Sequence, residues 1–268
     1  MTNTRLNELI EHFADRKIGV MGDFFLDKYI EFDPSLAEIS LETGKVANQI
    51  VNVRHSPGAA GNIVSNLVSL GAREVSAIGF TGDDGEGYEL RQDLTRIGCR
   101  TDHLLCVPER STPVYLKPRD VTVSGLAGEN ERYDTKNRRK LPENVEQQLI
   151  NLLPEALSQL DALIIADQAE EENCGVVTSR VRTALEQYAA NNPEMVFWVD
   201  SRRRIGSFAN CILKPNQFEA VSAVFPEAGS NFDLKKAIEA GRILNSRTGK
   251  PVFLTASERG LLVFHDRA

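Results

Sequence analysis

The sequence predicts an α/β fold in which a doubly wound parallel sheet carries helices on both faces and is joined to a small lid of β-strands. Three observations support this prediction. Short runs rich in β-branched residues alternate with longer segments of helical periodicity. The short runs are almost continuously apolar, as expected for strands that are covered on both faces. Two other stretches interrupt this order and alternate polar with apolar residues.

The elements of the main domain follow in chain order. Strands are predicted at residues 17–21, 75–79, 162–166, 196–200, 211–213, 251–255 and 261–264. Helices are predicted at residues 62–70, 86–97, 142–160, 176–190 and 233–246. Right-handed crossovers between parallel strands would bring the carboxyl ends of the strands to one edge, where such sheets bind their ligands.

The lid is predicted from two excursions, at about residues 27–54 and 111–132, within a single domain that spans residues 1–268. They contain the alternating segments Lys28-Tyr-Ile-Glu-Phe32 and Val114-Tyr-Leu-Lys117. Both excursions leave the main domain near the expected ligand crevice, so we interpret them as a flap over it. Ordinary surface hairpins are the alternative.

Composition excludes several classes of protein. The chain has 268 residues and a formal net charge of −7, which argues against a general nucleic-acid binder or a basic membrane-surface protein. No run reaches the ~18 apolar residues of a membrane span, and no export signal is recognisable. The four cysteines show no spacing typical of zinc sites or disulfide frameworks. We expect a cytoplasmic protein that acts on a small molecule.

A glycine-rich turn, Pro57-Gly-Ala-Ala-Gly-Asn62, leads directly into a predicted helix. Small residues let a ligand approach the backbone, and the N–H groups of a helix start suit oxygen-rich ligands. Asp23 and Asp27 follow the first strand, where carboxylates could accept hydrogen bonds from a polyol. We expect Asp23 to be an exposed carboxylate of the crevice. Turn formation is the alternative role for a Gly-Asp pair at this place.

A second motif, Leu213-Lys-Pro-Asn-Gln-Phe-Glu219, lies between a strand and a helix start. Asn216 and Glu219 would share one helix face and could hold water around Mg²⁺, while Lys214 would meet a phosphate. The same residues also match a capping box, which is the structural alternative. The sequence contains neither a P-loop motif nor a G-x-G-x-x-G turn, so P-loop and Rossmann nucleotide sites are not supported.

Several motifs together resemble a known family. Gly58-Ala-Ala-Gly-Asn62, Leu70-Gly-Ala72, Ile78-Gly79 and Gly82-Asp-Asp84 are similar, in order and spacing, to the N-terminal signature of the ribokinase or PfkB family of carbohydrate kinases. Gly22-Asp-Phe-Phe-Leu-Asp-Lys-Tyr29 and Leu213-Lys-Pro-Asn-Gln-Phe-Glu-Ala220 most resemble the kinase domain of the heptose-phosphate kinases of lipopolysaccharide precursor synthesis. The resemblance spans nearly the whole chain and implies a ribokinase-like three-layer fold with a lid.

The resemblance also implies a reaction: transfer of the γ-phosphoryl group of ATP to a hydroxyl of a sugar or sugar phosphate, with a heptose 7-phosphate as first candidate. ATP and Mg²⁺ are the implied cofactors, with a monovalent cation as a further candidate, and the lid implies a homodimer. The residues that it assigns to the sugar are Asp23, Asp27, Gly58, Gly61, Asn62 and Asp167. Those that it assigns to the nucleotide are Lys214, Asn216, Glu219, Thr255, Ser257 and Gly260, of which Asn216 and Glu219 would serve the metal through water.

One part of the family pattern does not occur in the sequence. A Gly-Ala-Gly-Asp turn, whose N–H groups form an anion hole and whose aspartate is the base, should follow strand 261–264, and the sequence ends at Ala268. We therefore assign no catalytic residue and expect a truncated kinase with impaired turnover. The alternatives are another sugar or nucleoside kinase of the family, and a non-catalytic sensor of sugars or nucleotides.

Overall fold

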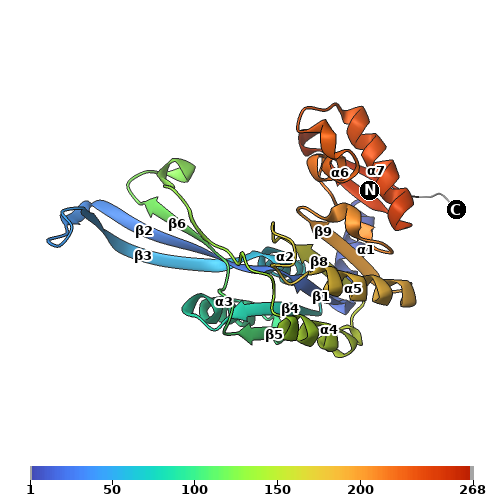
Figure 1. The fold of residues 1–268 in the computed structure, drawn as a ribbon, viewed down its shortest axis with the longest axis horizontal. Helices are drawn as coiled ribbons and strands as arrows, with labels where there is room; N and C mark the ends of the chain where they lie inside the picture. The colour runs from blue at the N-terminus through green and yellow to red at the C-terminus, as the bar shows by residue number, and fades with distance from the viewer. Residues whose placement is uncertain (1, 266–268) are drawn as a thin grey trace.

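The structure is a computed structural model that describes residues 2–265. Within these residues, eight strands form the main sheet in the order β12-β11-β10-β9-β8-β1-β4-β5 (Figure 1). Every neighbouring pair is parallel except β11 with β12. The strands are β1 (Lys17–Gly22), β4 (Glu74–Gly82), β5 (Arg100–Val107), β8 (Ala162–Asp167), β9 (Val196–Ser201), β10 (Ile212–Leu213), β11 (Val252–Thr255) and β12 (Leu261–Phe264).

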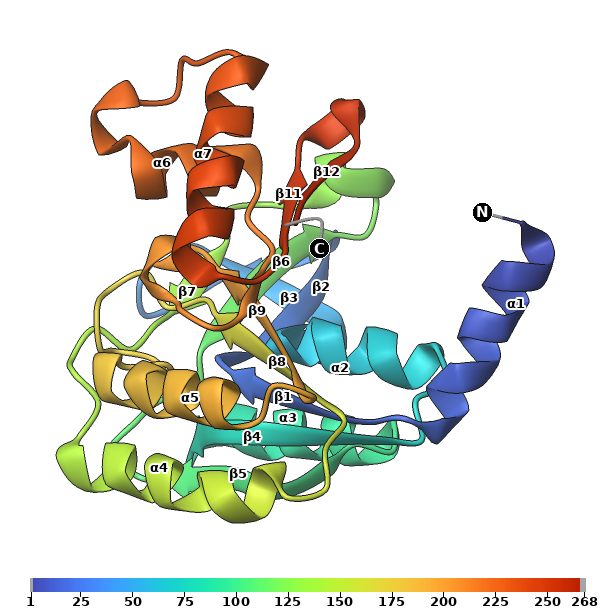
Figure 2. The ribbon, with the colours of Figure 1, turned by 90° about the vertical axis from the view of Figure 1, so that its right-hand side faces the viewer.

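Helices lie on both sides of this sheet (Figure 2). They are α1 (Asn3–Glu11), α2 (Ala60–Ser69), α3 (Gly85–Arg96), α4 (Glu143–Leu157), α5 (Ser179–Asn191), α6 (Gln217–Val224) and α7 (Leu234–Thr248). Side chains of β1 alternate between two cores: Val20 packs with residues of α2 and α3, and Met21 packs with residues of α4 and α5. The predicted three-layer α/β architecture is thereby confirmed.

A second sheet, here called the lid sheet, has the order β3-β2-β6-β7. Its strands are β2 (Phe24–Ile39), β3 (Val46–Ala59), β6 (Val114–Asp120) and β7 (Tyr133–Thr135). Strand β2 begins only one residue after the end of β1, and β3 runs directly into α2. The excursions predicted at residues 27–54 and 111–132 contribute to a separate small sheet, but β2 and β3 extend beyond the first range and β7 lies outside the second. This sheet extends from one end of the main domain (Figure 1).

Several boundaries differ from the prediction. Helix α2 begins at Ala60 rather than at residue 62, so Gly61 and Asn62 both lie in its first turn. Strand β5 was not predicted, because its first residues are polar and it forms the edge of the sheet. Helix α1 was not predicted either, and none of its residues is buried. Among residues 2–265, no helix combines the length and the hydropathy that crossing a membrane requires.

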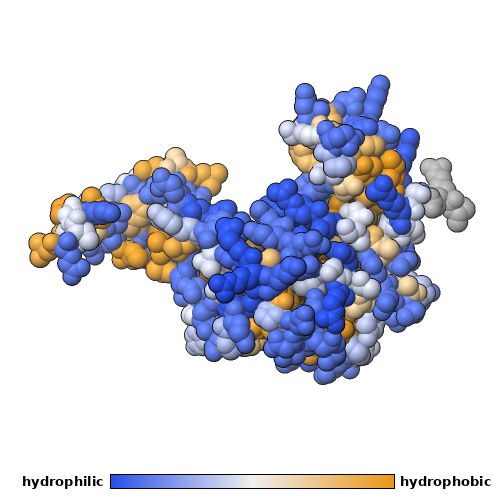
Figure 3. Space-filling model, viewed as in Figure 1, coloured by the Kyte–Doolittle hydropathy of each residue, from blue (hydrophilic) through white to orange (hydrophobic). Residues whose placement is uncertain are grey.

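The surface between the lid sheet and the part of the molecule that carries α6 and α7 is recessed and largely hydrophilic (Figure 3). Strands β1, β8, β9 and β10 are parallel neighbours, so their carboxyl ends share one edge of the sheet. The predicted Gly-Ala-Gly-Asp position after β12 lies outside the described residues.

Candidate active site

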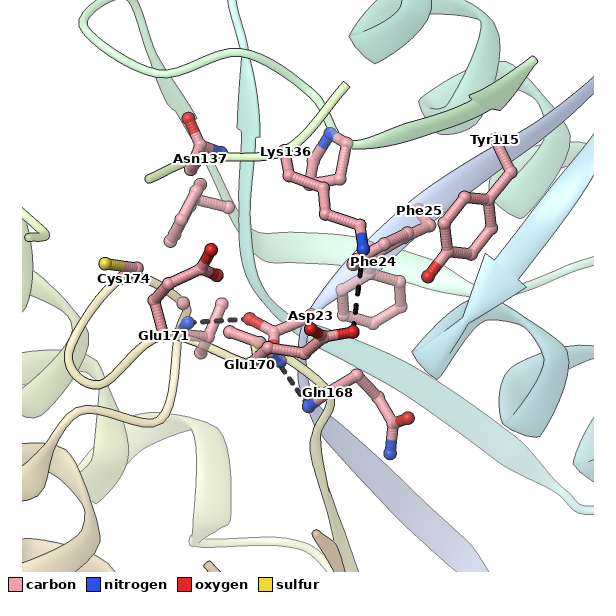
Figure 4. Close-up of a pocket in the computed structure, with 15 residues that line it drawn as sticks. Asp23, Phe24, Phe25, Tyr115, Lys136, Asn137, Gln168, Glu170, Glu171 and Cys174 are labelled. Atoms are coloured by element: carbon pink, nitrogen blue, oxygen red, sulfur yellow. Dashed lines mark hydrogen bonds and ion pairs between the residues drawn. The ribbon is translucent and has the colours of Figure 1, made fainter. Parts of the chain in front are cut away.

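A pocket lies where the end of β1, the base of the lid sheet and the loop after β8 meet (Figure 4). Apolar residues, including three phenylalanines, line it together with polar side chains, as is usual for small-molecule sites. The polar lining side chains come from the junction of β1 and β2, from β6, from the segment after β7 and from the loop after β8. The lining residues are Asp23, Phe24, Phe25, Phe80, Pro113, Tyr115, Lys136, Asn137, Gln168, Ala169, Glu170, Glu171, Cys174, Gly175 and Val176. We call this the lid pocket.

Asp23 lines the lid pocket, but the expectation that it is exposed is wrong. The residue is only 5 % exposed. Its Oδ2 accepts hydrogen bonds from the backbone N–H groups of Gln168 and Ala169, both at 2.8 Å, and its Oδ1 accepts one from Val176 at 2.8 Å. Burial and the neighbouring Asp167 raise the pKa of this carboxyl, and the three N–H groups oppose that change. Asp23 therefore anchors the loop that forms one wall of the pocket.

Asp27 lies on β2, four residues after Asp23, beside the lid pocket. In the sheet register it is opposite Tyr115, a lining residue. Its Oδ1 is 3.1 Å from Nζ of Lys117. A Cβ atom at Gly58 would approach Oδ2 of Asp27 to 2.8 Å, so only glycine fits there with the carboxylate in this position.

The other residues of the glycine-rich turn lie at the start of α2. A Cβ atom at Gly61 would approach Pro57 to 2.5 Å, which explains the requirement for glycine at this place. Asn62 is exposed in the first turn of the helix. Ala59, just before the helix, has a φ of 52°, in a region that favours glycine. Neither Gly61 nor Asn62 lines the lid pocket.

Asp167 ends β8 and is not among the lining residues of the lid pocket. It is 1 % exposed and forms a bidentate ion pair with Arg204, at 2.6 Å and 3.1 Å. The hydroxyl of Ser201 donates to the same carboxylate at 2.6 Å. Arg204 also donates to the carbonyl groups of Ala169 and Glu170. The geometry thus gives Asp167 a role in holding the loop after β8, and its assignment to the sugar stays a prediction.

A second hollow lies at the carboxyl ends of β10 and β11, and we call it the nucleotide-side hollow. Four of the residues predicted to bind nucleotide line it, which are Asn216, Thr255, Ser257 and Gly260, together with Gln217, Phe218 and Leu261. A β-bridge pairs Asn216 with Thr255, which explains why these segments, distant in sequence, come together. The structure therefore brings most of the predicted nucleotide residues to one place.

The capping box predicted as an alternative is present at the start of α6. Oδ1 of Asn216 accepts from the N–H groups of Phe218 and Glu219, and Oε2 of Glu219 accepts from the N–H of Asn216 at 2.8 Å. Nζ of Lys214 is 2.9 Å from a carboxylate oxygen of Asp200. Burial, together with the charge of Asp200, raises the pKa of Glu219.

These groups can also fit a magnesium–phosphate assembly. Oε1 of Glu219 accepts no hydrogen bond from any other residue among 2–265, so it is available to a metal-bound water. Asp200 supplies a second carboxylate close enough to affect the pKa of Glu219. Mg²⁺ usually keeps several waters and takes one or two carboxylates in addition to phosphate oxygens. The carboxylates of Glu219 and Asp200 are therefore compatible with Mg²⁺ binding through water, and Glu219 can cap the helix with Oε2 at the same time.

Sequence reasoning missed several residues that line the lid pocket. Gln168 and Glu170 lie in an irregular loop, and the only signal for that loop was the acidic run Glu170-Glu-Glu172. Tyr115 was inside a predicted lid segment but was not singled out. Lys136 follows a strand of three residues, and no pattern in the sequence distinguishes it from other lysines.

Sequence comparison agrees with the motifs. A profile of the pfkB family carbohydrate kinases matches residues 27–268. The bifunctional protein HldE of Hyphomonas neptunium is 30% identical over 271 residues, covering 97% of this chain and 51% of that protein. HldE of Desulfatibacillum aliphaticivorans is 26% identical over 259 residues, covering 94% and 49%. The chain thus spans about half the length of the curated relatives it matches.

Solved structures share the fold. Phosphofructokinase-2 from Escherichia coli, in complex with substrates and products, superposes with a TM-score of 0.65 at 19% identity, covering 94% of this chain and 76% of that one. Ribokinase from Cryptococcus neoformans var. grubii serotype A, in complex with ADP, gives 0.59 at 15% identity, covering 93% and 76%. The fold is therefore ribokinase-like. Because the family profile covers most of the sequence, the chain belongs to the PfkB family of carbohydrate kinases.

Proposed function

We propose that this chain forms the sugar-binding and nucleotide-binding parts of an ATP-dependent kinase that phosphorylates a hydroxyl of a sugar or sugar phosphate. One observation carries the proposal: the lid pocket and the nucleotide-side hollow both adjoin the carboxyl edge of one parallel sheet, in a member of this family. Phosphoryl transfer depends mainly on positioning and charge stabilisation, which two binding sites at one sheet edge can provide.

The proposed roles follow the geometry. Asp27, the backbone around Gly58 and Asn62 would contact the sugar, next to the lid pocket. Asp23 and Asp167 would act by holding the loop after β8, because their carboxylates are bound by that loop and by Arg204. Lys214, Asn216, Glu219, Thr255, Ser257 and Gly260 would serve ATP and Mg²⁺, which neutralises phosphate charge.

The first candidate substrate is a heptose 7-phosphate, supported by the similarity to HldE along nearly the whole chain. Thermal shift with ribose, fructose and the heptose 7-phosphate tests this choice, because a ligand at 100 times its Kd adds about 2.7 kcal/mol of stability. A clearly larger shift with the heptose 7-phosphate is expected. Equal shifts with all three compounds would remove the heptose assignment and leave a kinase of broader or different specificity.

Nucleotide binding needs a separate test. Lys214→Met should weaken binding of Mg²⁺–ADP in isothermal titration by about tenfold, because it removes one charge-assisted hydrogen bond to a phosphate. Lys235→Met, an exposed position on α7, is the matched control and should leave the Kd unchanged. Equal affinities of the two variants would contradict the assignment of Lys214.

We also propose that residues 1–268 on their own turn over slowly, because their sequence does not contain the Gly-Ala-Gly-Asp motif that supplies the family's base and anion hole. Loss of an anion-hole donor alone typically costs on the order of a hundredfold or more in rate. A coupled assay of sugar-dependent ADP formation measures this directly, and normal turnover would contradict it. The expected setting of the reaction is the cytoplasm, and a homodimer through the lid sheet is the proposed assembly.

A further inference from the structure

Lys136 is the only cationic side chain among the described residues that line the lid pocket (Figure 4). Its side chain is 23% exposed, and its Nζ is 3.6 Å from Oε1 of Glu170 and 3.7 Å from Oδ2 of Asp134. Both distances exceed those of charge-assisted hydrogen bonds, which are about 2.7–2.9 Å. The ammonium group therefore retains donors that an incoming ligand can use.

The other cations around the pocket are already committed to closer partners. Arg132 binds both oxygens of Asp134, at 2.6 Å and 2.8 Å, and its guanidinium lies over the ring of Tyr115. Lys117 pairs with Asp27 at 3.1 Å and donates to the hydroxyl of Tyr29.

Two further arginines, the buried Arg110 and the half-buried Arg204, are committed as well. Arg110 donates to the carbonyl groups of Arg139, Lys140 and Cys174, and so holds the segment after β7 against the loop after β8. Arg204 is bound to Asp167. A ligand could recruit these cations only by breaking contacts that support the pocket wall. Lys136 would give up only two long ion pairs and a distant contact with the ring of Tyr115, whose centroid is 5.9 Å from Nζ.

The carboxylates that line the lid pocket also differ in whether they already have close partners. Asp23 is bound by three N–H groups, and Glu171 pairs with Arg138 at 3.0 Å. Glu170 is the remaining one, and its only ion pair with a described residue is that to Lys136. Lys136 comes from the lid side and Glu170 from the loop after β8, so the pair spans the pocket (Figure 4).

We propose that Lys136 determines specificity for phosphorylated acceptors: the phosphate that the sugar already carries replaces Glu170 as the partner of the ammonium group. This inference rests on the proposed function and names the class of acceptor, a sugar phosphate, that the lid pocket prefers. A dianionic phosphate offers several strong acceptor oxygens, and a carboxylate at 3.6 Å is a weak competitor for the ammonium donors. A neutral sugar would leave the Lys136–Glu170 pair in place.

The test compares each sugar with its phosphate: ribose with ribose 5-phosphate, fructose with fructose 6-phosphate, and a heptose with its 7-phosphate. Binding to Lys136→Met, Glu170→Gln and the wild type is measured by isothermal titration at one ionic strength. Lys136→Met should weaken the preferred sugar phosphate about tenfold to a hundredfold, the value of a hydrogen bond to a charged group, and change its unphosphorylated partner less than about twofold. Glu170→Gln should tighten the sugar phosphate, because it removes the competing charge.

Lys140→Met is the matched control, since Lys140 is an exposed lysine of the same segment and does not line the pocket. It should bind both members of each pair as the wild type does. Equal weakening of a sugar and its phosphate by Lys136→Met would mean that the side chain only shapes the pocket, and unchanged binding would mean that it has no role. Either result overturns the inference while the proposed kinase function stands, whereas a wild-type chain that binds no sugar of either kind refutes both.

Discussion

Asp23 follows β1 directly and is hydrogen-bonded to the loop after β8, which lies about 145 residues further along the chain. The carboxylate uses both oxygens, and all three donors are backbone N–H groups of the loop after β8. A buried carboxylate is stable only when it is well hydrogen-bonded, so its position and that of the loop depend on each other. Gln168 and Glu170, which line the pocket, are placed by this anchor.

Replacement of Asp23 by asparagine should therefore affect stability. The amide has one acceptor oxygen, and its NH₂ group would face an N–H donor of the loop, which leaves at least one buried N–H group unpaired. We expect Asp23→Asn to lower the free energy of unfolding in urea by about 1–3 kcal/mol. Asp27→Asn is the comparison: it should weaken sugar binding and cost less stability, because the amide oxygen can still accept from Lys117, which also keeps its hydrogen bond to Tyr29. Equal stability of the two variants would show that Asp23 is not an anchor.

Glu219 gives a prediction for pH dependence. Burial, aided by Asp200, raises its pKa above the ordinary glutamate value of 4.5. The folded protein then binds this proton more readily than the unfolded chain does. Stability from this group is thus present at low pH, falls as pH rises from 4.5 through the raised pKa, and stays lost above it. Glu219→Gln keeps a capping box and cannot titrate.

The free energy of unfolding of Glu219→Gln, relative to the wild type, should increase between pH 4.5 and neutral pH. Urea titrations at several pH values in that range measure the difference. A difference that does not change with pH would show that Glu219 has the same pKa in the folded and unfolded states.

At the residue scale, the sequence predicted where several candidate site residues lie along the chain, but not which groups surround them. The positions of Asp27, Gly58 and Asn216 near strand ends could be predicted, because they belong to short motifs next to strands and parallel topology brings strand ends to one edge. The burial of Asp23 could not be predicted, because it depends on N–H groups of a loop far along the chain. Lys136 could not be predicted for the same reason: its proximity to Glu170 depends on how two irregular segments fold back over the pocket.

At the scale of elements, helix α3 holds the base of the lid sheet through an ion pair and a short hydrogen bond. Lys28 of β2 lies 2.7 Å from Glu89, and Nδ1 of His55 on β3 lies 2.5 Å from Oδ2 of Asp93. Asp93 is 3 % exposed and also pairs with Arg96. These contacts fix the two long strands of the lid sheet to the main domain near their point of origin, while their far ends extend away from it (Figure 1).

Asp93→Ala should lower the free energy of unfolding by about 1–3 kcal/mol, because it leaves His55 without its partner in a partly buried position and opens space beneath the lid. Asp102→Ala is the matched control, since Asp102 pairs with Arg100 on an exposed surface. Exposed pairs contribute at most about 1 kcal/mol, so the control should change stability little. Equal effects of the two substitutions in urea denaturation would mean that the contact with His55 does not hold the lid sheet.

The apolar runs predicted the main sheet well because every buried strand needs such a run, whatever its neighbours are. Edge elements were harder to predict. Strand β5 has exposed or half-buried polar residues at its start, and β7 has only three residues, all exposed. Elements of this kind are defined by pairing with a neighbour rather than by burial of their own side chains, and pairing is not visible in a single sequence.

At the scale of the whole molecule, the lid sheet carries a group of large hydrophobic side chains that are exposed to solvent. Large hydrophobic side chains that are exposed on it include Leu36, Ile39, Val46, Ile50, Val51 and Val53. Figure 3 shows apolar residues at the surface along the lid sheet. Contiguous exposed apolar patches usually mark interaction surfaces. Strand β3 is also an edge strand, with one side of its backbone free to pair.

A second copy of this chain is the proposed occupant of that surface, and Val53 provides the test. Val53 is 45 % exposed and lies opposite Ile30 in the register of β2 and β3. We expect the wild type to be a dimer in light scattering coupled to size exclusion, and Val53→Glu to be a monomer, because burial of an unpaired carboxylate in an apolar interface is unfavourable. Gln187→Glu adds the same charge at an exposed position of α5 and should remain a dimer. Since Val53 does not line the lid pocket, the monomer should bind sugar unless the partner subunit completes the site. A wild type that is monomeric at tens of micromolar, or a Val53→Glu variant that stays dimeric, would refute assembly through this face.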